Sequence, residues 1–142
     1  MDKEKLKNIF TKIGEVNPDY SLEKWVDNKA ELIRFIDDPS QELQLAVVQK
    51  NPNSIKYIQN PTEEVGLAVV KKWSPSIQYI QNPSERVQLA AVEQDLFSIY
   101  YIQNQTEEVQ LLVAKKFPHL IKYIKNPTEG VKQYLLSKGY KI

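Results

Sequence analysis

A single histidine is the first residue to consider for acid–base chemistry. His119 lies between Pro118 and Leu120, and the sequence contains no second histidine and no cysteine. It therefore offers neither a pair of imidazoles for proton transfer nor a thiolate for a metal or a nucleophile. It also lacks a glycine-rich phosphate loop, a nucleophile elbow and metal-ligand spacing. We predict that the chain is not an enzyme and uses no cofactor and no metal.

Carboxylates and lysines are plentiful, but they fall at regular places. Acidic residues follow Asn-Pro-Ser/Thr signals, whereas lysines end the apolar runs that come next, as at Lys71-Lys72 and Lys115-Lys116. Acidic residues at the start of a helix and basic residues at its end complement the helix dipole. The alternative is that the basic ends form an edge that contacts phosphates. The lysines concerned are Lys50, Lys71, Lys72, Lys115, Lys116 and Lys138.

These residues belong to an internal repeat. One isoleucine recurs every 22 residues without insertion, at Ile36, Ile58, Ile80, Ile102 and Ile124. An aromatic residue precedes it each time, and a Ser or Thr follows four residues later. Matching registers at several positions make chance a poor explanation, and a short period of this kind is typical of stacked repeat proteins.

Each unit contains the signals of two helices. Asn60 is a good N-cap, Pro61 suits the first helical position, and Glu63 would fall at N3 of a capping box. A breaker ends each long helix, as at Asn51-Pro52 and Ser74-Pro75. The segment between the breaker and the next Asn-Pro, such as Ile55–Ile58, therefore has room for only one or two turns, partly of 3₁₀ type. The predicted unit is a three-turn helix followed by a short one.

The apolar residues of the long helices cover more than one stripe. Val65, Leu67, Ala68, Val69 and Val70 are nearly consecutive, which indicates a helix buried on two flanks. Because one unit cannot bury this surface alone, neighbouring units must supply the cover.

The repeat resembles the leucine-rich repeat variant, a unit of one α-helix and one 3₁₀-helix, and is also similar to HEAT-type repeats. The matching residues are the Asn-Pro start, Val65, Leu67–Val70, Pro75 and the pair Ile77/Ile80, while Gln44, Gln88 and Gln110 stand where that family often has Arg. The resemblance implies a curved solenoid and brings no activity with it.

We therefore expect an all-α fold, a right-handed α-solenoid of about five two-helix repeats of 22 residues. Residues 1–16 should form an N-terminal capping helix, with membrane-surface binding as the alternative. Residues 17–142 should form the repeat domain, with a degenerate first repeat at 17–37, full repeats at 38–125 and a C-terminal cap at 126–142. A single longer helix from Ser21 is the alternative for the degenerate repeat.

Repeat positions that vary and stay polar are the candidate partner-binding residues. Tyr100 is the preferred anchor, because it adds an exposed aromatic beside Tyr101. Trp73 and Phe117 share one position and are either turn-packing residues or paired anchors. The tyrosines at 57, 79, 101 and 123 either pack between layers or stack on bases. The polar candidates are Lys56, Gln78 and Lys122 at one position and Gln59, Gln81 and Gln103 at another.

The leading functional prediction is a non-catalytic module that binds another protein, as an adaptor or as an inhibitor that acts by occupancy. Its size fits an inhibitor encoded by a phage or another mobile element and directed at a host protein complex. Nucleic-acid binding through the lysine edge is the alternative, although a net charge of +1 gives no general case for a polyanion. The charged start lacks a signal-peptide pattern and no apolar run is long enough to cross a membrane, so we expect a soluble cytoplasmic protein without membrane contact.

Overall fold

The computed structural model describes residues 30–141, and every regular element in that part of the chain is a helix. This confirms the all-α prediction for the described residues. The predicted capping helix at 1–16 and most of the degenerate repeat at 17–37 lie outside them. The elements, with η for 3₁₀-helices, are η1 (Ala30–Phe35), α3 (Gln41–Lys50), η2 (Pro52–Tyr57), α4 (Glu63–Lys72), η3 (Ser74–Tyr79), α5 (Glu85–Gln94), α6 (Ser98–Tyr101), α7 (Glu107–Lys116), η4 (Pro118–Tyr123) and α8 (Glu129–Ser137).

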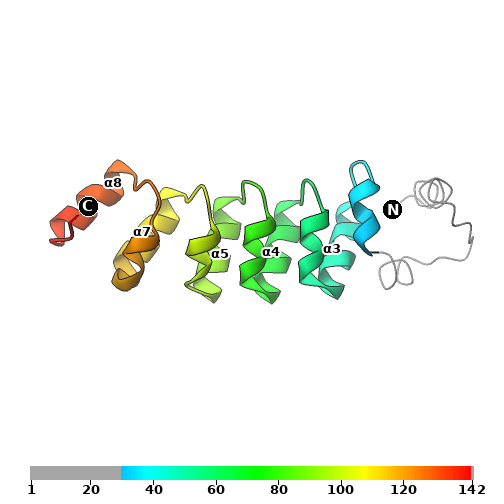
Figure 1. Ribbon diagram of the computed structural model, residues 1–142, viewed down its shortest axis with the longest axis horizontal. Coiled ribbons are helices and arrows are strands. Elements are labelled where there is room, and N and C mark those ends of the chain that lie inside the picture. Colours follow the sequence, from blue (N-terminus) through cyan, green and yellow to red (C-terminus); the bar gives the residue numbers. More distant parts are fainter. Residues whose placement is uncertain (1–29, 142) are drawn as a thin grey trace, which may run out of the picture.

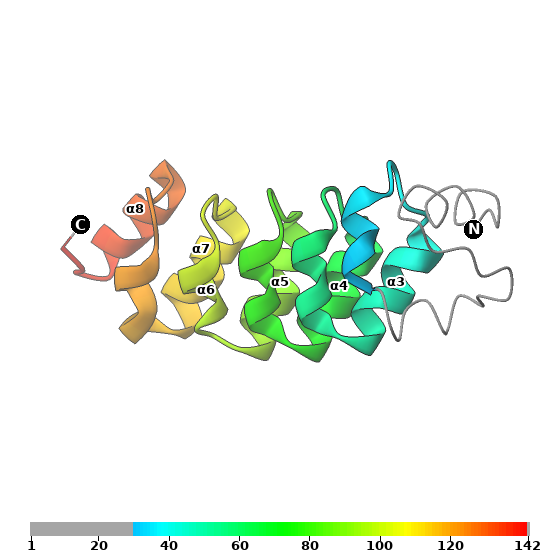
Figure 2. The same ribbon diagram turned by 45° about the vertical axis from the view of Figure 1, so that its right-hand side comes forward.

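The helices stand side by side in chain order. Figure 1 shows α3, α4 and α5 in a row, with α7 and α8 continuing towards the C-terminus, and the turned view in Figure 2 keeps this order. Each long helix packs on the next, from α3 to α4, α5, α7 and α8. The short helices η1, η2, η3 and α6 also contact one another in sequence. Equivalent positions of adjacent units are therefore neighbours in space.

The starts of the long helices differ from the sequence prediction. The N-cap is the hydroxyl residue, not the asparagine: Thr62 Oγ1 accepts a hydrogen bond from the Val65 N–H at 3.4 Å, and α4 begins at Glu63. Glu63 is thus at N1 and makes no capping box. In two units the asparagine adopts a turn conformation instead: Asn82 and Asn126 both have a φ of 46°, a left-handed conformation that asparagine tolerates better than most residues. Ser40, Ser84 and Thr128 cap α3, α5 and α8 in the same way.

The ends of the long helices follow the prediction. Asn51 closes α3 and, through its side-chain oxygen, caps η2 by accepting from the Asn53 N–H at 3.0 Å. Pro52, Pro75 and Pro118 lie in the first turn of the 3₁₀-helices, where a missing N–H costs nothing. The unit without this proline, at Asp95–Phe97, continues into the single α-turn of α6.

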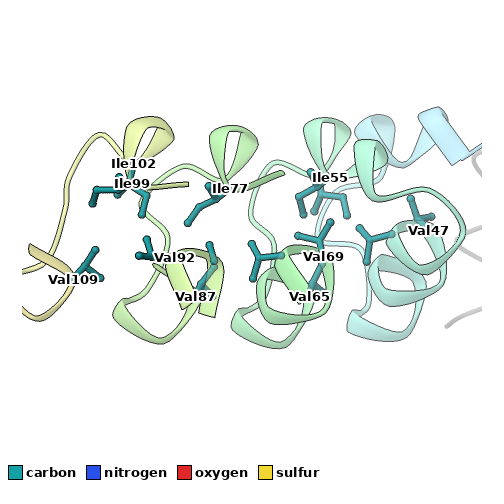
Figure 3. Close-up of a cluster of buried hydrophobic side chains, with 14 of the residues drawn as sticks. Val47, Ile55, Val65, Val69, Ile77, Val87, Val92, Ile99, Ile102 and Val109 are labelled. Atoms are coloured by element: carbon teal, nitrogen blue, oxygen red, sulfur yellow. The ribbon is translucent and has the colours of Figure 1, made fainter. Parts of the chain in front are cut away.

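The core runs through the row between the long and short helices. Figure 3 shows Ile55, Ile77 and Ile99 of the short helices above valines of the long helices. These isoleucines are at most 1% exposed, and Val65 and Val69 of α4 are fully buried. Burying one such side chain contributes roughly 1.5–3 kcal/mol. Because the isoleucines come from successive units, each unit depends on its neighbours for cover.

Buried glutamines link the starts of successive long helices. Gln88 is 2% exposed; its Oε1 accepts from the Thr106 N–H at 3.0 Å, and its Nε2 donates to the carbonyls of Pro83 and Asn104, both at 3.0 Å. Gln44 and Gln110 make equivalent links to Thr62 and Thr128. Each carboxamide satisfies backbone groups that the helix starts leave unpaired. We call these three residues the glutamine clamps.

Gln105 adds a further link between units. It replaces the repeat proline, and the sequence suggests a change of curvature or a contact point there. The structure shows it half-buried: its Nε2 donates to the carbonyls of Ile99 (3.0 Å) and Tyr123 (2.8 Å), while its Oε1 accepts from the Lys125 N–H at 2.8 Å. Gln105 therefore connects α6 to the unit that follows.

Restoring the repeat proline with Gln105→Pro is expected to destabilise the protein by about 2 kcal/mol, because three hydrogen bonds are lost and the Lys125 N–H loses its acceptor. The measurement is urea unfolding followed by circular dichroism. The control is Gln103→Ala, since Gln103 is exposed and accepts only a long bond of 3.4 Å from Lys125 Nζ. Unchanged stability of Gln105→Pro would show that the link contributes nothing.

The C-terminal unit is held by a smaller cluster. Val131 and Leu135 of α8 pack on Ala114 of α7. After α8 the Tyr140 N–H bonds back to the Leu135 carbonyl at 3.0 Å, with Gly139 at a φ of 80°, which is a glycine-terminated helix end. No second helix follows as far as residue 141. No helix among residues 30–141 combines the length and apolar character that membrane crossing requires.

Candidate interaction surface

The short helices carry a surface row of aromatic and polar side chains, which we call the aromatic row. The row consists of the residues at two adjacent positions of the repeat. Phe35 is 62% and Tyr79 is 39% exposed, while the tyrosines at 57, 101 and 123 are half-buried against the core, as the packing interpretation expects. The members are Phe35, Tyr57, Tyr79, Tyr101 and Tyr123 at one position, and Arg34, Lys56, Gln78, Tyr100 and Lys122, all exposed, at the other.

Contacts between units hold the row together. The Arg34 guanidinium lies 4.5 Å from the centroid of the Tyr57 ring in the next unit. Lys56 and Lys122 cover the rings of their own neighbours, Tyr57 and Tyr123, at 4.9 and 5.0 Å. Cations at these distances are attracted to the ring faces. The row thus carries three cations and no carboxylate.

Tyr100 is exposed and fixed in place. It is 57% exposed, and its ring meets Tyr101 edge-on at 5.4 Å and Tyr123 edge-on at 5.8 Å. Lys125 Nζ lies 5.9 Å from the ring centroid and donates to the Tyr100 carbonyl at 3.0 Å. An aromatic side chain already held by its neighbours loses little conformational freedom on binding.

Phe97 is a surface residue that the sequence analysis did not select. It is 59% exposed and is the N-cap residue of α6, three residues before Tyr100, a spacing that favours the same side of a helix. The signal was available in the repeat alignment, because Phe97 occupies the position of Pro75 and His119. A large apolar residue at a turn position stands out there. Phe97 extends the aromatic surface around Tyr100.

Trp73 and Phe117 do not have equal environments. Trp73 is 39% exposed at the turn between α4 and η3. Phe117 is half-buried at the turn between α7 and η4 and packs against the core. Both residues follow directly after the end of a long helix, whereas Tyr100 belongs to the short helix α6. Phe117 therefore has a packing role, and Trp73 offers more free surface.

The polar candidates also differ in availability. Gln78 folds back, with its Nε2 donating to the Pro75 carbonyl at 3.1 Å. Gln59, Gln81 and Gln103 are exposed in the turns before the asparagines. Gln59 and Gln81 line the same pocket between two units. This places two of the candidates around one hollow.

Glu63 is the centre of a small charged cluster beside that pocket. Its Oε1 accepts from the Ser84 hydroxyl at 2.5 Å, and its Oε2 accepts from Arg86 Nη1 at 2.8 Å. The Ser84 hydrogen bond is the main reason that the pKa of Glu63 lies below its ordinary value of 4.5; desolvation opposes this effect and the Arg86 charge supports it. The cluster joins the start of α4 to the start of α5 in the charged form.

The Glu63 cluster gives a pH-dependent contribution to stability. Because folding depresses the pKa, the contribution is present above pH 4.5 and is lost as the pH falls through the folded-state value. We expect Glu63→Gln to lower the melting temperature at pH 7, with a difference from wild type that shrinks at pH 3 and in high salt. Glu64→Gln, one residue further along α4, is the charge-matched control. A difference that is constant with pH would contradict the expectation.

The lysine edge is interrupted and partly engaged. The end of α5 carries Glu93 and Gln94 where α4 and α7 carry lysine pairs. Lys72 Nζ donates to the Gln49 carbonyl of the preceding unit. Lys115 Nζ lies 5.8 Å from the Tyr134 ring. Lys72 and Lys115 thus interact with a carbonyl and a ring of the chain itself.

Residues 30–141 contain no group of three or more His, Cys, Asp or Glu residues that could hold a metal ion. In a comparison with known proteins, no family model, no curated protein and no solved structure matches the chain. The similarity to helical repeats therefore rests on the sequence pattern alone. The functional argument therefore depends on the geometry described above.

Proposed function

We propose that the chain is a right-handed α-solenoid that binds another protein through the aromatic row, as an adaptor or as an inhibitor that acts by occupancy. The observation that carries the proposal is Tyr100, an aromatic side chain that is exposed and held by two ring contacts. Aromatic residues of this kind are enriched among the residues that dominate binding energy. The 22-residue repeat and the contacts between successive units support the solenoid.

The charge of the row indicates the kind of partner. Arg34, Lys56 and Lys122 are exposed between aromatic rings, with no carboxylate in the row. We propose a partner surface that presents Asp or Glu next to an apolar or aromatic patch. Such charges steer association and make its rate fall with salt.

The test is affinity capture with the immobilised protein. Wild type is expected to retain a specific protein from a lysate of the source cell, and Tyr100→Ala is expected to weaken that interaction at least tenfold. Tyr100→Ala should remain folded, since the ring contacts contribute only about 1 kcal/mol each. Leu136→Ala, which removes an apolar side chain 61% exposed on α8, is the matched control and should bind like wild type. Equal retention by both variants would contradict the proposed surface.

Nucleic-acid binding through the lysine edge is the second candidate function. Its dependence on salt and on lysine residues distinguishes it from protein binding through the aromatic row. Phosphate contacts release counterions, so this function predicts a steep loss of affinity with salt. It also predicts that Lys115→Ala/Lys116→Ala weakens binding while Tyr100→Ala does not. The interruption at Glu93 and Gln94 places it behind the protein-binding proposal.

A further inference from the structure

One glutamine clamp is missing, and a pocket lies in its place. Gly66 occupies the repeat position of Gln44, Gln88 and Gln110. A pocket of about 320 Å³ opens between α4 and α5, lined by residues 59–63 and 80–84 together with Gly66 and Val87. The pocket is therefore in the same place, one unit along, as the side chains of the clamps.

The backbone groups that a clamp would satisfy are free. In the next unit Gln88 bonds the Thr106 N–H and the carbonyls of Pro83 and Asn104. The corresponding groups at Gly66 are the Ser84 N–H and the carbonyls of Pro61 and Asn82. Within residues 30–141 none of these three makes a hydrogen bond. One donor and two acceptors thus border the pocket, which matches the oxygen and the NH₂ of a carboxamide.

Close packing alone does not account for Gly66. A Cβ added there would lie 3.0 Å from Val87 Cγ2 and 3.6 Å from Ile80 Cδ1, so glycine lets the two helices approach. The pocket nevertheless persists beside this contact. Other units of the same chain fill the equivalent space with a carboxamide, which shows what chemistry this backbone arrangement accepts.

We propose that the Gly66 pocket binds a side-chain carboxamide, Gln or Asn, from a bound polypeptide. The guest oxygen accepts from the Ser84 N–H, and its NH₂ donates to the carbonyls of Pro61 and Asn82. A carboxylate of the same shape has no hydrogen to donate to the two carbonyls, so the site prefers an amide. The exposed Gln59 and Gln81 also line the pocket and offer further amide contacts. The identity of the polypeptide rests on the proposed function; the pocket chemistry does not.

The direct test uses propionamide as the probe and propionate as its isosteric control. In a two-dimensional ¹H–¹⁵N NMR titration of the full chain, propionamide is expected to shift the Ser84 amide in a saturable way with millimolar affinity, and propionate should bind at least tenfold more weakly. No saturable shift of Ser84, or equal shifts with the two probes, would overturn the proposal. Binding at the aromatic row does not enter this measurement, so its failure and that of the proposed function are distinguishable.

A pair of variants tests the same groups through their effect on stability. Gly66→Gln supplies the missing clamp. Gly66→Met is its control, because methionine has a similar length and makes the same Cβ contact with Val87 but carries no amide. If the three backbone groups accept a carboxamide, Gly66→Gln melts several degrees above Gly66→Met and no longer responds to propionamide. Equal melting temperatures would contradict the proposal. Should neither variant fold, the wild-type titration still decides.

Discussion

Replacing Gln88 with methionine is expected to lower the free energy of unfolding by about 3 kcal/mol. Methionine keeps the length of the side chain but cannot bond the Thr106 N–H or the carbonyls of Pro83 and Asn104, all of which bond Gln88 at 3.0 Å. These backbone groups are partly buried, and leaving them without partners costs more than the bond itself contributes in water. The loss should fall on the joint between α5 and α7.

Gln94→Met on the same helix is the matched control. Gln94 is exposed and makes one hydrogen bond, from its Nε2 to the Lys71 carbonyl at 2.7 Å, so its replacement should cost less than about 1 kcal/mol. Urea unfolding followed by circular dichroism compares the two variants. If both lose the same small amount, the clamps do not join the units energetically.

The helix positions were predictable because their signals are local. The breakers Asn51-Pro52, Ser74-Pro75 and Phe117-Pro118 end helices wherever they occur. Apolar residues such as Val65 and Val69 repeat with the unit, and the structure buries them completely. Both kinds of signal act within a few residues, so the order of long and short helices follows from reading one unit.

The cap assignment was wrong because two good caps stand two residues apart. Asn60 and Thr62 both suit an N-cap, and sequence alone does not rank them. The structure places Thr62 at the cap, so that Glu63 and Glu64 open α4 near the positive end of its dipole. In two of the units the asparagine, Asn82 or Asn126, instead takes a left-handed turn conformation.

The clamps and the pocket could not be predicted from one unit. A glutamine on a helix is usually exposed, and the partners of Gln88 come in part from Asn104 and Thr106 of the next unit. Gly66 is informative only once the clamps are known. Likewise, Phe117 was considered as an anchor because its position matches Trp73, while its half-buried state depends on packing against neighbouring units.

Ile99→Ala is expected to cost about 4 kcal/mol. Ile99 is fully buried in α6 and belongs to the isoleucine row of Figure 3, with core residues of adjacent units on both sides. Truncation removes most of the side chain, and two packed neighbours limit how far the cavity can collapse. Because cost rises with the cavity that remains, a central position should be near the upper part of the range for aliphatic truncations.

Leu135→Ala supplies the comparison that makes this prediction specific. Leu135 is only 2% exposed, but it belongs to the small cluster between α7 and α8, which has no further helix beyond it as far as residue 141. A terminal unit can relax towards solvent, so its truncation should cost about 2 kcal/mol. Leu136→Ala, exposed on the same helix, should cost less than about 0.5 kcal/mol. Equal losses for Ile99→Ala and Leu135→Ala would show that stability does not depend on having a neighbour on each side, which is the property that a stacked array of units requires.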